Sequence, residues 1–224
     1  MTTARMLVAL SLLFGLGYPL LWGRGLAPEA MIAIKGAGVG LLAIAAAWRA
    51  RGADGWLLAA VMALGAAGDV LLEIDFAAGA SAFANGHIVA IILYLRNRRG
   101  AAGLLDRAIA AFLPAAAAAL PLLLLSDRPE NLAFALYGAL VGAMAAAAWT
   151  SRFPRPLAGA GAMVFVISDM LIAARMGSDL EWLGLPIWLL YYLGQLMIFL
   201  GVATSLPPRG RSPGGGGPPK AVEG

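Results

Sequence analysis

The sequence predicts an all-α integral membrane protein, a bundle of eight transmembrane helices. Of its 224 residues, 61% are hydrophobic and only 12% are charged, whereas soluble domains are about 45–50% apolar and about 25% charged. The mean hydropathy is +0.83. The apolar residues fall into eight stretches of about 20 residues, the length of helix that crosses a hydrocarbon core of about 30 Å. Short connections separate them, so we expect one compact helical domain.

The predicted spans follow one another closely. They cover residues 6–23, 29–48, 56–74, 77–95, 108–126, 131–150, 156–174 and 183–205. The first is long for the apolar region of a signal peptide and ends without a small-residue cleavage site, so we expect it to be retained. Small residues such as KGAGVG in the second span and AAAAAL in the fifth indicate tight packing, because they let membrane helices approach closely.

Basic residues gather on one side of the predicted membrane. If the spans alternate in direction, one side holds most of the 16 Lys and Arg residues: Arg5, Arg49, Arg51, Arg96, Arg98, Arg99, Arg107, Arg152, Arg155, Arg209, Arg211 and Lys220. The other side holds Arg24, Arg128 and Arg175 with Glu29, Asp75, Asp127, Glu130, Asp179 and Glu181. Short cytoplasmic loops retain basic residues. We therefore expect both termini in the cytoplasm, with the protein in a bacterial inner membrane, and no nucleic-acid partner.

The last residues differ from the rest in composition. Residues 207–224, PPRGRSPGGGGPPKAVEG, have too little apolar surface to offset their ordering entropy. We expect a transmembrane domain of residues 1–206 followed by a disordered cytoplasmic tail.

Two pairs of spans resemble each other weakly. LGAAGDVLLEI in the third span resembles MVFVISDMLIA in the seventh, and NGHIVAIILYL in the fourth resembles LGQLMIFLGV in the eighth. An offset of four spans corresponds to two four-helix repeats in parallel orientation. Chance similarity is the alternative.

Five polar side chains lie inside apolar spans at comparable depths: Lys35, Asp69, His87, Asp169 and Gln195. With a rise of about 1.5 Å per residue, they lie roughly 8 to 18 Å from the acidic-side ends of their spans. A carboxylate at the membrane centre costs roughly 2.5–3.5 kcal/mol, so intramembrane acids are functional candidates. We expect the five side chains to line one cavity open toward the acidic side.

Two of these residues have a structural alternative. Asp69 and Lys35 could form a buried ion pair that only joins helices. His87 could be a neutral core histidine bonded to a carbonyl group.

Helical spacing adds further candidates. Glu73 follows Asp69 by four residues and shares its helix face, although Glu73 and Asp75 are close enough to the interface to be simply solvated. Tyr191 and Tyr192 precede Gln195 by four and three residues. Together with Trp188, these tyrosines are more often packing residues or interfacial anchors than ligands.

A metal site and a serine nucleophile are less favoured. Asp69, Glu73, His87 and Asp169 could in principle hold a cation. The single histidine and the lack of cysteine fall short of the two or three nitrogen or sulfur ligands of hydrolytic zinc sites, so we expect no metal or other cofactor. Ser168 points about 100° away from Asp169 on the same helix.

Four motifs occur in order along the chain: GDVLL in the third span, FANGHIVAI in the fourth, GAMVFVISDMLIA in the seventh and LLYYLGQLMI in the eighth. In order, spacing and distribution over the spans they resemble the motifs of the YhhN-like lysoplasmalogenase family of eight-span membrane proteins. The resemblance runs from Lys35 to about Val202. It implies hydrolysis of the vinyl ether bond of a lysoplasmalogen to a fatty aldehyde and a glycerophosphocholine or glycerophosphoethanolamine.

The resemblance also assigns residues to this activity. The family positions fall on Lys35, Asp69, His87, Asp169, Tyr191, Tyr192 and Gln195. The chain departs from the family at Gly36, where proline is usual, and at Ala90, where tyrosine is usual. The second departure removes a hydroxyl group, which bears on substrate preference.

A pair of carboxyl groups suits the chemistry of a vinyl ether, which is acid-labile. Burial and a neighbouring carboxylate favour the neutral form of a carboxyl group, so one of a pair can donate a proton while the other stabilises the oxocarbenium ion. In glycoside hydrolysis, too, one carboxyl group of a pair acts as the acid while the other acts as the carboxylate. The expected roles are catalysis for Asp69 and Asp169, positioning for His87, Tyr191 and Gln195, and head-group binding for Lys35 and Glu73.

A proton-coupled transporter of a small solute or lipid is the principal alternative, because it too would bury two acids at matched depth. Transporter helices are usually interrupted at the site, and only Gly65 and Gly68 before Asp69 indicate such a break. A scaffold without chemistry is a third possibility. The partners we expect are a lysophospholipid substrate and membrane lipid.

Overall fold

The computed structural model describes residues 2–100, 103–125, 129–178 and 180–207, and this part of the chain is helical. It contains eight α-helices: α1 (Thr3–Gly17), α2 (Pro28–Arg49), α3 (Gly52–Leu71), α4 (Phe76–Arg96), α5 (Leu104–Leu124), α6 (Asn131–Thr150), α7 (Ala160–Met176) and α8 (Gly184–Ser205). Three short helical turns accompany them: η1 (Tyr18–Leu21), η2 (Arg155–Gly159) and η3 (Glu181–Leu183). Eight helical segments are long and apolar enough to cross a membrane. This confirms the predicted all-α bundle of a multi-pass membrane protein.

The predicted spans agree to within about four residues at each end with the eight membrane-length segments, in which η1, η2 and η3 are counted with α1, α7 and α8. This is the usual uncertainty of helix boundaries. The tail expected at residues 207–224 lies outside the described residues, apart from Pro207.

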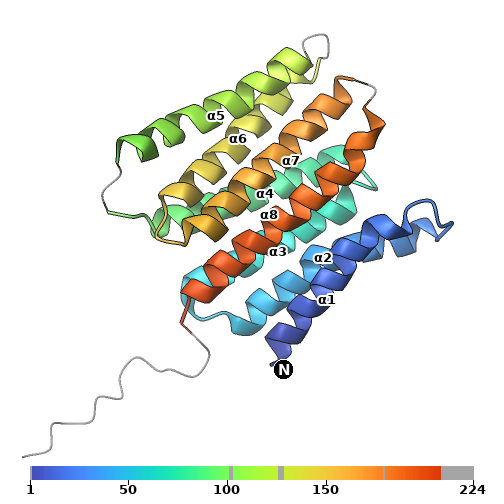
Figure 1. Cartoon of the computed structure of the whole chain (residues 1–224), viewed down its shortest axis with the longest axis horizontal. Helices are drawn as coiled ribbons and strands as arrows, with labels where there is room; N and C mark the ends of the chain where they lie inside the picture. Colours follow the sequence, from blue (N-terminus) through green and yellow to red (C-terminus); the bar gives the residue numbers. More distant parts are fainter. Residues whose placement is uncertain (1, 101–102, 126–128, 179, 208–224) are drawn as a thin grey trace, which may run out of the picture.

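The helices alternate in direction, so the connections after α1, α3, α5 and α7 lie together at one end of the bundle, at the upper right of Figure 1. We call this the acidic end, after Glu29, Glu73, Asp75, Glu130 and Glu181. The opposite, basic end carries Arg49, Arg96, Arg152 and Arg155. The pairs α1–α2 and α5–α6 flank the bundle, with α3, α4, α7 and α8 between them (Figure 1). Of these, α8 packs against α2, α3 and α7, and α4 packs against α3 and α6.

The contact between α5 and α6 shows the tight packing that small residues permit. A Cβ atom added at Gly142 of α6 would lie 2.6 Å from the backbone oxygen of Leu113 on α5. Gly138, one turn earlier, faces the backbone of Ala117 in the same way. The backbone of α5 therefore lies directly on two glycines of α6.

Replacing Gly142 with leucine should destabilise the bundle by about 1–3 kcal/mol, the usual cost of overpacking, because α5 must move away from α6. The apparent melting temperature of the purified protein in detergent measures this change. Gly17→Leu is the matched control, since nothing lies within 4 Å of a Cβ atom added at Gly17. Equal melting temperatures for the two variants would contradict the packing role of Gly142.

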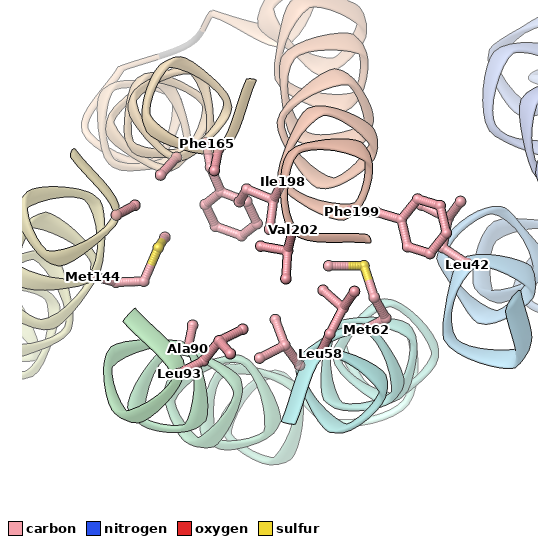
Figure 2. Packing of buried hydrophobic residues seen from close by; sticks show 14 of the residues in the cluster. Leu42, Leu58, Met62, Ala90, Leu93, Met144, Phe165, Ile198, Phe199 and Val202 are labelled. Carbon is pink, nitrogen blue, oxygen red and sulfur yellow. The ribbon is translucent and has the colours of Figure 1, made fainter. Parts of the chain in front are cut away.

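Apolar side chains fill the half of the bundle toward the basic end. Figure 2 shows side chains of this core that come from several helices, among them Leu42 of α2, Leu58 and Met62 of α3, Met144 of α6 and Val202 of α8, and all five are buried. This core fills the bundle on the side of the basic end, whereas the acidic half contains a cavity.

Candidate functional site

A cavity of about 550 Å³ lies in the acidic half of the bundle. Trp22, Glu130 and Arg175, which lie in or beside the connections of the acidic end, are among its lining residues. Deeper in, side chains of α3, α4, α6, α7 and α8 form its wall, and most of them are apolar. Its size and mostly apolar wall are typical of sites for small organic ligands.

Asp69 enters the cavity from α3. It is 2% exposed, and the hydroxyl of Tyr191 on α8 donates a hydrogen bond to its Oδ2 at 2.8 Å. One turn earlier, a Cβ atom added at Gly65 would lie 2.8 Å from Nε2 of Gln195. The glycine therefore lets α8 approach α3 closely enough for Tyr191 to reach the carboxyl group.

Asp169 lines the same cavity from α7 and is 8% exposed. The hydroxyl of Tyr137 on α6 donates to its Oδ2 at 3.1 Å, and the same hydroxyl lies 3.1 Å from Nε2 of His87 on α4. Which of the two groups donates in this second bond depends on the tautomer of His87. The His87 ring also packs edge-on against Phe165, with centroids 5.1 Å apart. Residues of α4, α6 and α7 thus form one series of hydrogen bonds, from His87 through Tyr137 to the carboxyl group of Asp169.

Lys35 and Glu73 form an ion pair nearer the acidic end. Nζ of Lys35 lies 2.5 Å from Oε1 of Glu73, and both residues line the cavity. The alternative in which Lys35 pairs with Asp69 is therefore wrong: the lysine binds the carboxylate one turn beyond Asp69. The pair offers one positive and one negative group to the cavity.

Three predicted site residues are not among the described residues that line this cavity. His87 and Gln195 instead line a separate cavity of about 20 Å³ nearer the basic end, about the room needed for one water molecule. The hydroxyl of Tyr192 turns toward α1 and lies 2.8 Å from Oγ of Ser11. The expectation that all five polar residues line one cavity is therefore wrong for His87 and Gln195.

Two other polar residues have structural partners. Oγ of Ser168 donates to the carbonyl oxygen of Ile187 at 2.8 Å, which joins α7 to α8. Oδ1 of Asp75 accepts a hydrogen bond from the backbone N–H of Ala78 at 2.7 Å. Asp75, which we expected to be only solvated, is therefore the N-terminal cap of α4.

Tyr137 is the site residue that the sequence analysis missed. It lies in the apolar stretch NLAFALYGAL of the sixth span, six residues after Asn131 and thus roughly 9 Å from the acidic-side end. Lys35 and Asp69 have about the same depth. Applying the depth criterion to tyrosine hydroxyls as well as to charged groups would have identified Tyr137.

The arrangement can perform acid–base chemistry on an apolar substrate. Two carboxyl groups from different helices line one mostly apolar cavity, and each accepts a hydrogen bond from a tyrosine. Such a pair can supply one acid and one base. Among the described residues no three Asp, Glu or His side chains form a metal-binding cluster, so Asp69, Glu73, His87 and Asp169 do not assemble into the cation site considered above.

A family model described as the YhhN family matches residues 30–202. The matched region runs from α2 to near the end of α8 and contains both aspartates and the two tyrosines that bond them. No curated protein and no solved structure matches the chain.

Proposed function

The chain belongs to the YhhN family, and from this premise we propose that it is a membrane-embedded lysoplasmalogenase. Its substrate is a lysoplasmalogen, an alkenyl glycerophosphocholine or glycerophosphoethanolamine, and it hydrolyses the vinyl ether bond. The products are a fatty aldehyde and a glycerophospho-alcohol. The observation that carries the proposal is that Asp69 and Asp169, both buried, line a single cavity with a mostly apolar wall.

The proposed reaction begins with proton transfer to carbon. One aspartate in its neutral form gives its proton to the β-carbon of the vinyl ether, and the electrons of the double bond form the new C–H bond. The oxocarbenium ion that results is stabilised by the other, ionised aspartate. Water adds to the α-carbon and loses a proton to that carboxylate, which gives a hemiacetal. The hemiacetal then breaks its bond to the glycerol oxygen. Its hydroxyl proton passes to the first aspartate, and the glycerol oxygen takes the proton held by the second aspartate, so the aldehyde and the glycerophospho-alcohol form and both carboxyl groups return to their starting states.

The two tyrosines support this division of roles. The Tyr191 and Tyr137 hydroxyls each fix the orientation of one carboxyl group. His87 contacts Tyr137 and does not line the main cavity. In this proposal His87 is therefore a positioning residue, and Asp69 and Asp169 are the catalytic residues.

The cavity suits a lipid whose head group lies toward the acidic end. Lys35 offers a point charge to the phosphate, and Glu73 lies beside it. The alkenyl chain would lie along the apolar part of the wall, which includes Leu72, Phe83 and Met170. The vinyl ether, between head group and chain, then lies at the level of the aspartates.

One feature favours the hydrolase over the transporter. Both α3 and α7 are continuous α-helices at Asp69 and Asp169, whereas transporter sites usually lie at interrupted helices.

Hydrolysis of a lysoplasmalogen by the purified protein in D₂O tests this proposal. We expect a fatty aldehyde with one deuterium on the carbon next to the carbonyl group, because the proton added to the β-carbon comes from a carboxyl group that exchanges with solvent. Mass spectrometry of the aldehyde measures the label. Protein without lipid, and lipid without protein, are the controls.

The absence of aldehyde release above the lipid-only control would refute the hydrolase. Release of an unlabelled aldehyde would refute proton transfer to carbon as the first step. Uptake of a labelled solute into proteoliposomes, without aldehyde release, would support the transporter instead.

The charge distribution supports an orientation for the protein. We propose that the basic end and both termini face the cytoplasm of a bacterium, with the protein in the inner membrane. The cavity then opens toward the opposite, outer surface, and lysophospholipid reaches it from that side.

A further inference from the structure

Three aromatic rings line the cavity beside the Lys35–Glu73 pair: Tyr18, Trp22 and Trp188. Tyr18 begins the turn η1, Trp22 directly follows it, and Trp188 lies in the first turns of α8. They therefore belong to the acidic end, at the level where a head group would lie. The acid–base chemistry proposed above uses none of them.

The rings form a corner rather than a flat stack. Tyr18 and Trp22 meet edge to face, with centroids 5.7 Å apart and an interplanar angle of 86°. The Trp188 ring lies 4.6 Å from the Tyr18 ring and is tilted by 55°. The three rings contact one another, and each also lines the cavity, so together they present a continuous aromatic surface to a group bound there.

Trp188 is held firmly in this corner. Its Nε1 donates to the backbone oxygen of Gly15 at 2.7 Å, and the residue is buried. The ring also stacks on Tyr192, with an interplanar angle of 13°, so the part of Trp188 that lines the cavity is carbon surface. Trp22 is 39% exposed and lies at the rim.

An interfacial-anchor role does not account for these rings as well. Trp182 of η3 lies at the same end of the bundle, is 68% exposed and is not among the residues that line the cavity, as is typical of an anchor. Trp22 and Trp188 do line the cavity. Trp22 and Trp188 therefore contact the cavity, whereas Trp182 has the exposure of an interfacial anchor.

The charges beside the corner suit a zwitterionic head group. Tyr18, Lys35 and Glu73 line the same cavity, so the ion pair and the rings face one enclosed space. The guanidinium of Arg175 also lines the cavity, but it is paired with Glu181. Glu73 and Lys35 are paired with each other, so the cavity presents one negative and one positive group side by side, in the same arrangement as the cation and the phosphate of a zwitterionic head group.

Choline and ethanolamine differ in what they require from such a site. A trimethylammonium group donates no hydrogen bonds, and aromatic faces attract it strongly once it is removed from water. A primary ammonium group carries three N–H donors that need acceptors, which the carbon faces of the rings do not supply. An aromatic corner next to one carboxylate therefore favours the quaternary cation.

We propose that Tyr18, Trp22 and Trp188 bind the trimethylammonium group of a choline head group, with Glu73 beside it and Lys35 on the phosphate. The chain would thus prefer single-chain phosphocholine lipids to their phosphoethanolamine counterparts. This inference rests on the proposed function in one respect, namely that the cavity takes a lysophospholipid.

Binding of ordinary 1-acyl lysophospholipids tests the inference without the chemistry, because these lipids lack a vinyl ether. Purified full-length protein in mixed micelles is titrated calorimetrically with lysophosphatidylcholine and with lysophosphatidylethanolamine of the same chain length. We expect the choline lipid to bind about tenfold more tightly. Phosphocholine without a chain forms a third titration and should bind far more weakly, since the head group alone lacks the chain contacts.

The variant Trp22→Leu should reduce the choline preference to about threefold or less, while binding of the ethanolamine lipid stays the same and shows that the protein is folded. Trp22→Phe should keep part of the preference. Trp182→Leu is the matched control and should keep all of it. Equal affinity for the two lipids, no binding of lysophosphatidylcholine, or an unchanged preference in Trp22→Leu would each overturn the inference.

The failure of this inference differs from the failure of the proposed function. Choline preference without aldehyde release from a lysoplasmalogen would retain the aromatic site and refute the hydrolase. Aldehyde release without choline preference would do the opposite.

Discussion

Asp169→Asn should lower the rate of aldehyde release from lysoplasmalogen at least about 10²-fold, the low end of the contribution of general acid–base catalysis. The amide has almost the shape of the carboxyl group but can neither donate a carboxyl proton nor carry the negative charge that stabilises an oxocarbenium ion. Its oxygen can still accept the hydrogen bond from Tyr137. The fold should therefore persist while the chemistry is lost.

The measurement is the initial rate of aldehyde formation at saturating lipid, with protein unfolding followed in parallel. Asp54→Asn is the matched control: Asp54 belongs to the basic end, where it binds Arg96 and Arg152, and its loss should leave the rate near that of the wild type. An Asp169→Asn enzyme with wild-type activity would remove Asp169 from the mechanism.

Asp69→Asn should cause a loss of similar size, at least about 10²-fold, because the proposed reaction needs one acid and one ionised partner at the same time. The amide oxygen of the substituted side chain can still accept the hydrogen bond from the Tyr191 hydroxyl. The double variant is the sharper measurement. If the two carboxyl groups act as a unit, removing both should slow the enzyme little more than removing one, as is found for residues that act together.

Strictly multiplicative losses in the double variant would instead indicate two independent roles. A scaffold without chemistry predicts a third pattern, in which each aspartate variant lowers the melting temperature and no variant, nor the wild type, releases aldehyde.

The fold was accessible from the sequence because the membrane imposes one strong constraint. A helix that crosses about 30 Å of hydrocarbon must be long and apolar, and all eight segments show this in their composition. Helix ends depend on local chemistry instead. The cap formed by Asp75 is such a case, since an acidic residue near the interface suggests solvation as readily as capping.

The sequence predicted how deep the site residues lie in the membrane, but not in which direction their side chains point around each helix. Counting residues from the span end gave the level of Lys35, Asp69 and Asp169, which all line the cavity. It could not show that Tyr191 faces the cavity while Tyr192, the next residue, faces α1. Successive residues on a helix point about 100° apart, so the answer depends on how α8 is turned against its neighbours.

Pairing across helices was also beyond the sequence. His87 and Gln195, which occupy matching places in the weakly similar fourth and eighth spans, line the same small cavity; the repeat itself stays a prediction. The bond of Asp169 to Tyr137 depends on α6 lying beside α7. No local pattern in the sixth span indicates that neighbour.

The apolar core at the basic end determines on which side of the membrane the two products would be released. In the described part of the chain, buried apolar residues such as Leu42, Met144 and Val202 fill the half of the bundle toward the basic end. Under the proposed function, a lipid admitted at the acidic end would therefore be released there too. The water-soluble glycerophosphodiester then returns to the compartment that its head group already faced, and the aldehyde remains in the same leaflet. An enzyme built in this way would transfer protons inside the bilayer without letting ions leak across it.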